Sequence, residues 1–252
     1  MRLSLVDRCP SAIVNAQTEG VRTWADGQAS GGRNMAGRTI AIGDIHGHSA
    51  ALAALVNRLE LTPADTLVLL GDYVDRGPDS KGVIELILGL RQHCQLVPLM
   101  GNHEEMMLQA RTDRRARWMW LDNGGDQALL SYGDEGNPRS IPESHYEFLA
   151  GLSRVFETET HFFVHANYSP NFKLSEQPAM TALWLPLDEP PGPHYSGKTA
   201  VVGHTPQPDG RVLDLGHLVC VDTGCGFGGL LTAYEPASGR VWQVDERGQA
   251  VG

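Results

Sequence analysis

Chemically active side chains follow five apolar segments of this chain, at the points where those segments end. Three blocks lie in the first half: Gly43-Asp44-Ile45-His46-Gly47, Gly71-Asp72-Tyr73-Val74-Asp75-Arg76-Gly77 and Gly101-Asn102-His103-Glu104. In the second half, His165 and His204 each follow another apolar segment. Carboxylates, imidazoles and carboxamides are the side chains that hard and borderline divalent ions accept. The residue types therefore predict a metal site, provided that the fold brings the five segments together.

Crowding alone argues for cations at such a site. Many acidic groups packed together would have raised pKa values, because of mutual repulsion and loss of solvent. Divalent ions remove that penalty. Two ions about 3.5–4 Å apart, bridged by one carboxylate, form an arrangement used for in-line displacement at phosphorus. Phosphoester cleavage is thus the chemistry that this set of side chains suits.

The elements around these blocks predict how they meet. Short apolar runs at residues 39–42, 66–70 and 96–100 are typical of buried strands, and residues 51–59 and 80–92 have mainly helical spacing. The order β-α-β-α-β predicts parallel pairing with right-handed crossovers. Because ligands gather at the carboxyl ends of strands in open α/β sheets, the three blocks should lie at one edge.

The second half is richer in strands. Residues 103–153 are expected to be mostly helical, and strands are expected at 162–164, 199–202, 218–221, 230–234 and 240–244. The fold class is therefore α/β (α+β), with residues 37–252 as a single two-layered domain. Residues 1–36 are Gly-, Ser- and polar-rich. We expect them to be an extension outside the core, either mobile or not native because the start codon lies too far upstream.

Composition excludes several function classes. The 252 residues include 20 Lys and Arg against 30 Asp and Glu, a net charge of −10, which disfavours binding nucleic acid over a broad face. No apolar run approaches the roughly 18 residues that span a bilayer, and the first 17 residues lack the long apolar stretch typical of a signal peptide. Four cysteines without a metal-binding spacing fit a reducing compartment. These features predict a cytoplasmic protein with neither a membrane nor a nucleic-acid partner.

The three blocks, in this order and with two later histidines after strands, resemble the signature of the phosphoprotein phosphatase family, bacterial type. That family is a branch of the calcineurin-like metallophosphoesterases. The resemblance runs from about residue 39 to residue 244. It implies a central β-sandwich flanked by helices and two divalent metal ions, with manganese expected and iron or zinc as alternatives.

Residue roles follow from the resemblance position by position. It implies six metal ligands: Asp44, His46, Asp72, Asn102, His165 and His204. Asp44 and His46 hold the first ion, Asp72 bridges both, and the other three hold the second. Arg76 and Asn102 contact the substrate phosphate, while His103, held by Asp75, protonates the leaving oxygen. A metal-bridging hydroxide attacks phosphorus directly, without a phosphoenzyme.

Two features depart from known patterns. Many family members carry an arginine after a Leu-Trp pair, but here Leu183-Trp184 is followed by Leu185-Pro186. Lys198 and Arg211 are the candidates to supply that charge. Residues 224–229 match G-x-G-x-x-G, but the following residues have strand character, so the dinucleotide-binding interpretation fails. We interpret this stretch as a glycine-rich turn at the rim of the site.

Three functions are compatible with the sequence. The first is a serine/threonine protein phosphatase acting on a phosphorylated protein or a small phosphorylated substrate. The second is a bis(5'-nucleosyl)-tetraphosphatase, because Gly203-His204-Thr205-Pro206 also resembles the bacterial enzymes that cleave dinucleoside polyphosphates. The third is an inactive metal-binding regulatory module, which is disfavoured because every metal-ligand position is filled.

Overall fold

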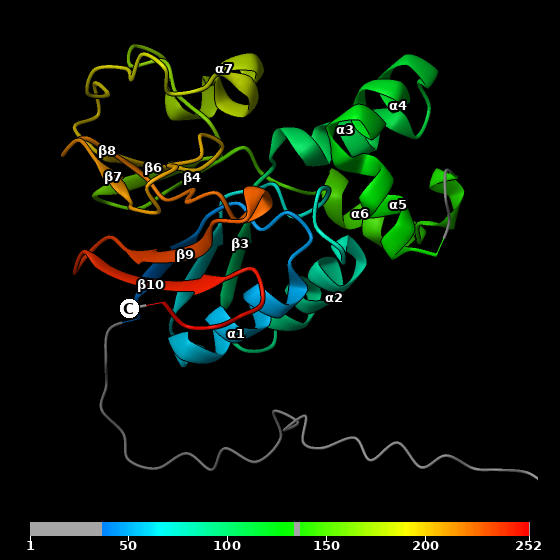
Figure 1. The fold of residues 1–252 in the computed structure, drawn as a ribbon. Helices are drawn as coiled ribbons and strands as arrows, with labels where there is room; N and C mark the ends of the chain where they lie inside the picture. The colour runs from blue at the N-terminus through cyan, green and yellow to red at the C-terminus, as the bar shows by residue number, and fades with distance from the viewer. Residues whose placement is uncertain (1–36, 134–136, 252) are drawn as a thin grey trace, which may run out of the picture. The chain divides into compact units, whose positions relative to one another are not determined.

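The computed structural model describes residues 37–133 and 137–251, which contain two five-stranded sheets with helices around them (Figure 1). The first sheet has the order β10-β9-β1-β2-β3 and the second the order β4-β5-β6-β8-β7. Their facing sides share one apolar cluster, which includes Val68 and Leu99 from the first sheet region and Phe163 and Val201 from the second. The expected β-sandwich is therefore confirmed.

The first sheet begins with the predicted alternation of strands and helices. Its strands β1 (Thr39–Ile42), β2 (Thr66–Leu69) and β3 (Gln95–Pro98) pair in parallel, with Ile42 opposite Leu69. Helices α1 (Ser49–Leu59) and α2 (Ser80–Leu90) connect them. The spacing that predicted each helix also buries one face of it; in α1 that face includes Leu52, Leu55 and Leu59. The carboxyl ends of the three strands consequently lie at one edge.

The C-terminal hairpin completes this first sheet. Strands β9 (Leu230–Glu235) and β10 (Arg240–Asp245) are antiparallel, and β9 pairs with β1 through Ile42 and Ala233. The second half of the chain thus contributes to both sheets. The second sheet comprises β4 (Val155–Glu157), β5 (His161–Val164), β6 (Thr199–Val202), β7 (Leu213–Asp214) and β8 (Leu218–Cys220). Strands β5, β6 and β8 are parallel, so the ends of β5 and β6 point the same way.

A helical region joins the two sheets. It contains α3 (Asn102–Ala110), α4 (Arg114–Trp120), the π-helical turn η1 (Leu121–Gly125), α5 (Asp126–Ser131) and α6 (Glu143–Ala150). Helix α7 (Ala179–Trp184) follows β5. The expected helical character of residues 103–153 is confirmed for most of that stretch. No helix in the described residues is long and apolar enough to cross a bilayer.

Some sequence expectations concern single residues. Cys94, Cys220 and Cys225 are free and buried, as expected for small apolar side chains. His194 lies in a Pro-Gly loop and yet is only 2% exposed. Its two ring nitrogens bond to Ser196 and to the Phe172 carbonyl. The extension expected at residues 1–36 lies outside the described residues.

Asp65 fastens the start of the first sheet. Its buried carboxylate accepts hydrogen bonds from the backbone and guanidinium of Arg38 and from the backbone and hydroxyl of Thr62. These bonds outweigh the opposing effect of burial and lower the pKa of Asp65 to about 2. A carboxylate whose pKa is lowered on folding stabilises the fold above its unfolded pKa, and this stabilisation is lost as pH falls through the folded pKa.

We expect Asp65→Asn to lower the free energy of unfolding at pH 7 by about 1–3 kcal/mol, the usual range for charge-assisted hydrogen bonds. The difference from the unsubstituted protein should shrink as pH falls from about 4 towards 2. Urea unfolding measures both effects. Asp209→Asn is a matched control, because Asp209 is exposed and accepts only a local bond from the backbone of Arg211. Equal unfolding midpoints for both variants would contradict the prediction.

Candidate metal centre

The five polar segments meet at the carboxyl ends of strands in both sheets. Asp44 and His46 follow β1, and Asp72 follows β2. Asn102 begins α3, just beyond β3. His165 and His204 follow β5 and β6. The parallel arrangement of these strands therefore delivers six side chains from distant parts of the sequence to one place.

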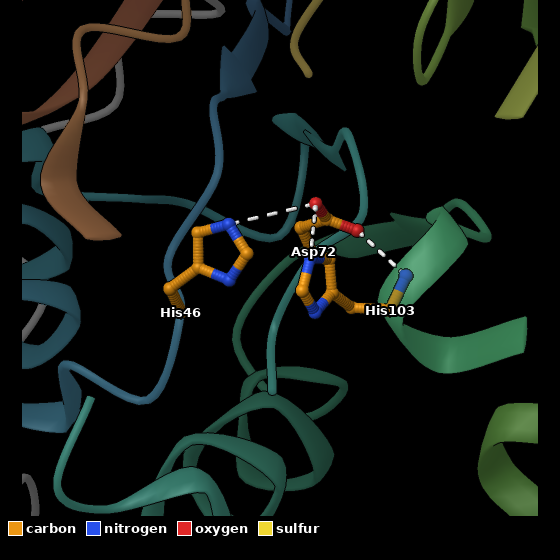
Figure 2. Close-up of side chains that lie close together, drawn as sticks. All are labelled: His46, Asp72 and His103. Atoms are coloured by element: carbon orange, nitrogen blue, oxygen red, sulfur yellow. Dashed lines mark hydrogen bonds and ion pairs between the residues drawn. The ribbon is translucent and has the colours of Figure 1, made fainter. Parts of the chain in front are cut away.

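Asp72 lies at the centre of this group. Its Oδ2 is 3.5 Å from His46 Nε2 and 3.9 Å from His103 Nε2, and Figure 2 shows these two rings directed at the carboxylate. Its Oδ1 is 3.4 Å from His165 Nε2. Within the described residues, two sets of side chains bring metal-binding atoms within 4.8 Å of one another: His46, Asp72 and His103, and Asp72, His165 and His204. Asp72 is the member that both sets share.

Three of the histidines are oriented by backbone carbonyls. His46 Nδ1 lies 3.0 Å from the Val74 carbonyl, His165 Nδ1 lies 2.8 Å from the Leu70 carbonyl, and His204 Nε2 lies 3.2 Å from the Trp184 carbonyl. A carbonyl only accepts, so each of these nitrogens must carry the proton. The other nitrogen of each ring then presents a lone pair. This is the arrangement that holds imidazole metal ligands in place.

Burial favours the neutral form of these rings. It lowers the pKa of His46 to about 3, helped by the nearby Arg76 guanidinium. It also lowers the pKa of His165 and of His204. Neutral imidazole is the form that binds metals, so the rings are ready as ligands at neutral pH. Burial has the opposite effect on the carboxyl group of Asp72, whose pKa is raised, and a bound cation would restore the ionised form.

Asn102 faces the second set of side chains. Its Oδ1 is 3.0 Å from His165 Nε2 and 3.1 Å from His204 Nδ1, the two nitrogens that carry lone pairs. The opposite amide orientation would instead direct an N–H to these nitrogens and to the Asp72 carboxylate. Asn102 Oδ1 is repelled by the two imidazole lone pairs and by the Asp72 carboxylate unless a cation lies between these groups. Oxygen is also the amide atom that binds cations. The donor set therefore fits a divalent metal ion.

Asp44 lies beside the loop that follows β6. It is buried, and its carboxylate accepts from the backbone N–H of His204 at 3.1 and 3.2 Å. A Cβ on Gly203 would clash with Asp44 Oδ1, so a side chain there would displace this carboxylate. The sets of closely spaced ligand atoms include His103 in the first set and leave Asp44 out. Asp44 nevertheless lies close enough to the other acids that Asp222 and Asp72 add to the raised pKa that burial gives it.

His103 and Asp75 form a buried pair beside Asp72. His103 Nδ1 lies 2.7 Å from Asp75 Oδ2, which leaves Nε2 facing Asp72. Burial lowers the pKa of His103, and the neighbouring His46 ring and Arg76 guanidinium act in the same direction. Both His103 and Asn102 lie in the first turn of α3. The resemblance groups His103 with Asp75, and in the structure these two side chains are in contact.

Arg76 and Phe227 form part of the rim. Arg76 Nη1 lies 2.6 Å from His46 Nε2. The guanidinium therefore donates to the same lone pair with which His46 would bind a metal ion. The guanidinium also stacks on the Phe227 ring, 4.4 Å from its centre. Phe227, in the 3-10 turn η4 (Cys225–Phe227), is 65% exposed, whereas Cys225 anchors the turn in the core. The sequence predicted a turn at this rim but gave no sign of the stacking.

Backbone strain is concentrated in the same residues. Six non-glycine residues in the described parts of the chain have positive φ, and five of them are His46, Asp72, Asp75, Arg76 and His204. Residues other than glycine are disfavoured at positive φ by steric clashes, and such strain persists only where the surrounding contacts impose it. The strain therefore marks the same loops as the sequence blocks did.

Glu104 is a supporting residue whose part the sequence did not reveal. It is fully buried, and its carboxylate accepts from the backbone N–H groups of Asp72, Tyr73, Val74 and Gly101. These bonds tie the loop after β2 to the start of α3. Its position in the third block was the available signal, but the direction of its side chain was not predictable from the sequence.

The charge expected after Trp184 is absent from that position. Leu185 is 50% exposed there. Of the two candidates, Lys198 pairs with Glu157 at 2.5 Å, which occupies its ammonium group. Arg211 is exposed, and the bond from its backbone N–H to Asp209 concerns only its own loop. Neither contact places a second cation at the metal centre.

Phe227→Ala removes the surface on which Arg76 stacks. Exposed cation–π contacts stabilise by about 0.5–1 kcal/mol, so we expect KM for a phosphate monoester to rise about two- to fivefold with little change in kcat. Steady-state kinetics measures this. Phe172→Ala is the control, because Phe172 is also half exposed and its backbone carbonyl bonds to Gln177 and His194, which are not among the predicted site residues. An unchanged KM in Phe227→Ala would show that the stacking does not position Arg76.

Comparisons with known proteins agree with this geometry. The family model described as calcineurin-like phosphoesterase matches residues 37–229. Serine/threonine-protein phosphatase 1 of Salmonella typhimurium is 29% identical over 209 residues, covering 76% of this chain and 88% of that relative. The asymmetrical bis(5'-nucleosyl)-tetraphosphatase PrpE of Anoxybacillus flavithermus is 25% identical over 220 residues, covering 76% and 87%.

A solved structure shares the fold. The cold-active protein-tyrosine phosphatase of a psychrophilic Shewanella species superposes with a TM-score of 0.58 at 18% identity, over 85% of this chain and 80% of that one. With the sheet arrangement and the sequence blocks in agreement with the family match, this chain belongs to the calcineurin-like phosphoesterase family and is a metallophosphoesterase.

Proposed function

We propose that this phosphoesterase is a serine/threonine protein phosphatase that hydrolyses phosphate monoesters with two divalent metal ions, manganese being the expected metal. The observation that carries the proposal is the set of three buried histidines, each held by a backbone carbonyl, around the shared carboxylate of Asp72. The similarity to serine/threonine-protein phosphatase 1, which extends along 88% of that relative, supports the proposed substrate.

The described side chains suggest how the metals would be held. His46 and Asp72 would bind the first ion, with Asp44 close by, and Asp72, Asn102, His165 and His204 would bind the second. When bound, such ions would offset the negative charge of the phosphoryl group. Because the proposed reaction depends on these ions, activity should be lost when they are removed and should return when they are added back. We expect a chelator to remove activity and added Mn²⁺ to restore it.

The other residues would handle the phosphate and the proton. The guanidinium of Arg76 has the planar shape that pairs with two phosphate oxygens. As an imidazolium, with Asp75 accepting from Nδ1–H, His103 would donate the second proton, on Nε2, to the leaving oxygen and return to the neutral ring. Water would then displace the leaving group directly at phosphorus. The buried positions of Asp75 and His103 keep this pair from exchanging partners with solvent.

A dinucleoside polyphosphate hydrolase is the second candidate. Phe227 favours it, since an exposed aromatic ring beside the proposed phosphate-binding arginine offers a stacking surface for a base. The PrpE relative, 25% identical, supports the same possibility. The two candidates share the site chemistry and differ in what is attached to the phosphate.

A substrate panel tests the proposal. Purified protein with Mn²⁺ is assayed with phosphoserine and phosphothreonine peptides, diadenosine tetraphosphate and p-nitrophenyl phosphate, with Asp72→Asn as the inactive control. We expect the highest kcat/KM for the phosphopeptides. A higher value for diadenosine tetraphosphate would favour the second candidate. Metal binding without hydrolysis of any of these substrates would indicate a regulatory module.

A further inference from the structure

Trp120, the last residue of α4, is completely buried although its indole carries a polar N–H. A buried indole N–H needs a hydrogen-bond partner. Its partner is Asp75, whose Oδ1 and Oδ2 lie 2.9 and 3.0 Å from Trp120 Nε1. The two residues are 45 positions apart in the sequence. A bond from α4 therefore reaches directly into the loop after β2.

The same Asp75 carboxylate also contacts His103. Its Oδ2 lies 2.7 Å from His103 Nδ1, while its backbone N–H donates to Ser80 Oγ at 2.9 Å. The carboxylate is completely buried, and water cannot substitute for a lost donor there. Trp120 and His103 together thus determine how the carboxylate is turned.

The same segment also supports Arg76. Gly124, in the π-helical turn after Trp120, accepts from the backbone N–H of Arg76 at 3.1 Å. Its φ of 99° and its distance to Arg76 require glycine, since a Cβ would lie 2.7 Å from the Arg76 nitrogen. Trp120 ends α4, and Gly124 lies at a kink four residues later, where Asn123 and Gly124 leave the helical conformation. One segment therefore contacts two successive residues of the loop, Asp75 and Arg76.

We propose that Trp120 is a positioning residue for phosphoester hydrolysis. Its N–H holds the Asp75 carboxylate in the orientation that accepts from His103 Nδ1–H and turns Nε2, the nitrogen that would give up its proton, towards the substrate. The proposal rests on the proposed role of His103. Packing alone does not account for a tryptophan at this position, because a phenylalanine ring could fill apolar space without donating a hydrogen bond to a carboxylate. Trp120 touches no substrate and acts only through Asp75 and His103.

The test removes the N–H and keeps the shape. Site-specific incorporation of 3-benzothienylalanine at position 120 replaces the indole N–H with sulfur. The same replacement at Trp118, which is 60% exposed, is the matched control. Trp120→Phe is a second variant. Each protein is assayed for kcat and KM on a phosphoserine peptide and on p-nitrophenyl phosphate, and for metal content and Tm.

We expect benzothienylalanine at position 120 to lower kcat on the phosphoserine peptide at least tenfold, with KM, metal content and Tm near those of the unsubstituted protein. The loss should be smaller on p-nitrophenyl phosphate, whose leaving group needs less protonation. In a His103→Asn background the same replacement should change kcat less than twofold, because residues that act through one another are not additive. The control at position 118 should change nothing.

Two results would overturn the proposal. One is an unchanged kcat with only a lower Tm, which would show that Trp120 merely packs. The other is an equal loss on both substrates, or a further large loss in the His103→Asn background. If the unsubstituted protein cleaves p-nitrophenyl phosphate but no phosphoserine peptide, the proposed substrate is wrong. Glycerol 2-phosphate then serves as the alkyl ester, and the comparison still decides the role of Trp120.

Discussion

Replacing Asp72 with asparagine should abolish hydrolysis and lower the metal content of the purified protein. Its two carboxylate oxygens point at different histidines, Oδ2 at His46 and Oδ1 at His165, so one group serves both sets of ligands. Asparagine keeps one neutral oxygen and replaces the other with an N–H donor, which repels a cation. The substitution therefore removes charge and a ligand atom together.

Activity on p-nitrophenyl phosphate and metal analysis measure this prediction. Asp209→Asn again provides a control, since it makes the same chemical change at the surface. Circular dichroism must show that the variant is folded, because the Asp72 carboxylate also accepts from the backbone N–H of His103. A folded Asp72→Asn protein with its full metal content would refute the bridging role.

Replacing His103 with asparagine should leave both metals bound and slow turnover. The geometry permits two roles for this ring, because His103 Nε2 lies 3.9 Å from Asp72 Oδ2. Nε2 can donate a proton to the leaving oxygen, or it can bind the metal ion that Asp72 holds. We favour the acid because Asn102, its neighbour in α3, already faces the second set of ligands. Loss of a general acid slows reactions by about 10²–10⁴-fold.

The leaving group separates these two roles. The loss should reach about 10²–10⁴-fold on an alkyl phosphate and shrink on an aryl phosphate, because a phenolate leaves with less protonation. Parallel assays on a phosphoserine peptide and p-nitrophenyl phosphate, together with metal analysis, provide the comparison. Equal losses on both esters, or the disappearance of one metal, would make His103 a ligand instead.

Local patterns in the sequence were enough to predict the strands and loops that carry the site. The apolar runs at β1, β2 and β3 were predicted to within two residues at either end, because buried parallel strands show as short apolar segments. The polar blocks follow those runs directly. Parallel pairing then requires that Asp72 and Asn102 meet, and the structure brings them together.

Pairing between distant strands was not predictable in the same way. Strand β9 returns to pair with β1, and nothing local to residues 230–235 distinguishes that partner from a strand of the second sheet. The short strands β4 and β7 lack a run long enough to be recognised. Edge pairing depends on which backbone groups remain free once the rest has folded, and that is a property of the whole domain.

Side-chain directions were the other limit. The sequence did not indicate that a ring nitrogen of His103 would lie as close to His46 and Asp72 as the atoms of a metal site do. The bonds from Glu104 to three backbone groups after β2, and from Trp120 to Asp75, depend on rotamers that only the packed structure determines. These supporting residues carry no motif that shows their direction.

Electron paramagnetic resonance of the Mn²⁺-loaded protein tests the two-metal site most directly. Metal-free protein is titrated with Mn²⁺ while activity and the spectrum are followed together. We expect activity to saturate at two ions per chain, with the many-line spectrum of an exchange-coupled Mn²⁺ pair that is absent from Asp72→Asn. Saturation at one ion per chain, with only the six-line spectrum of isolated Mn²⁺, would contradict a centre in which Asp72 joins two metals.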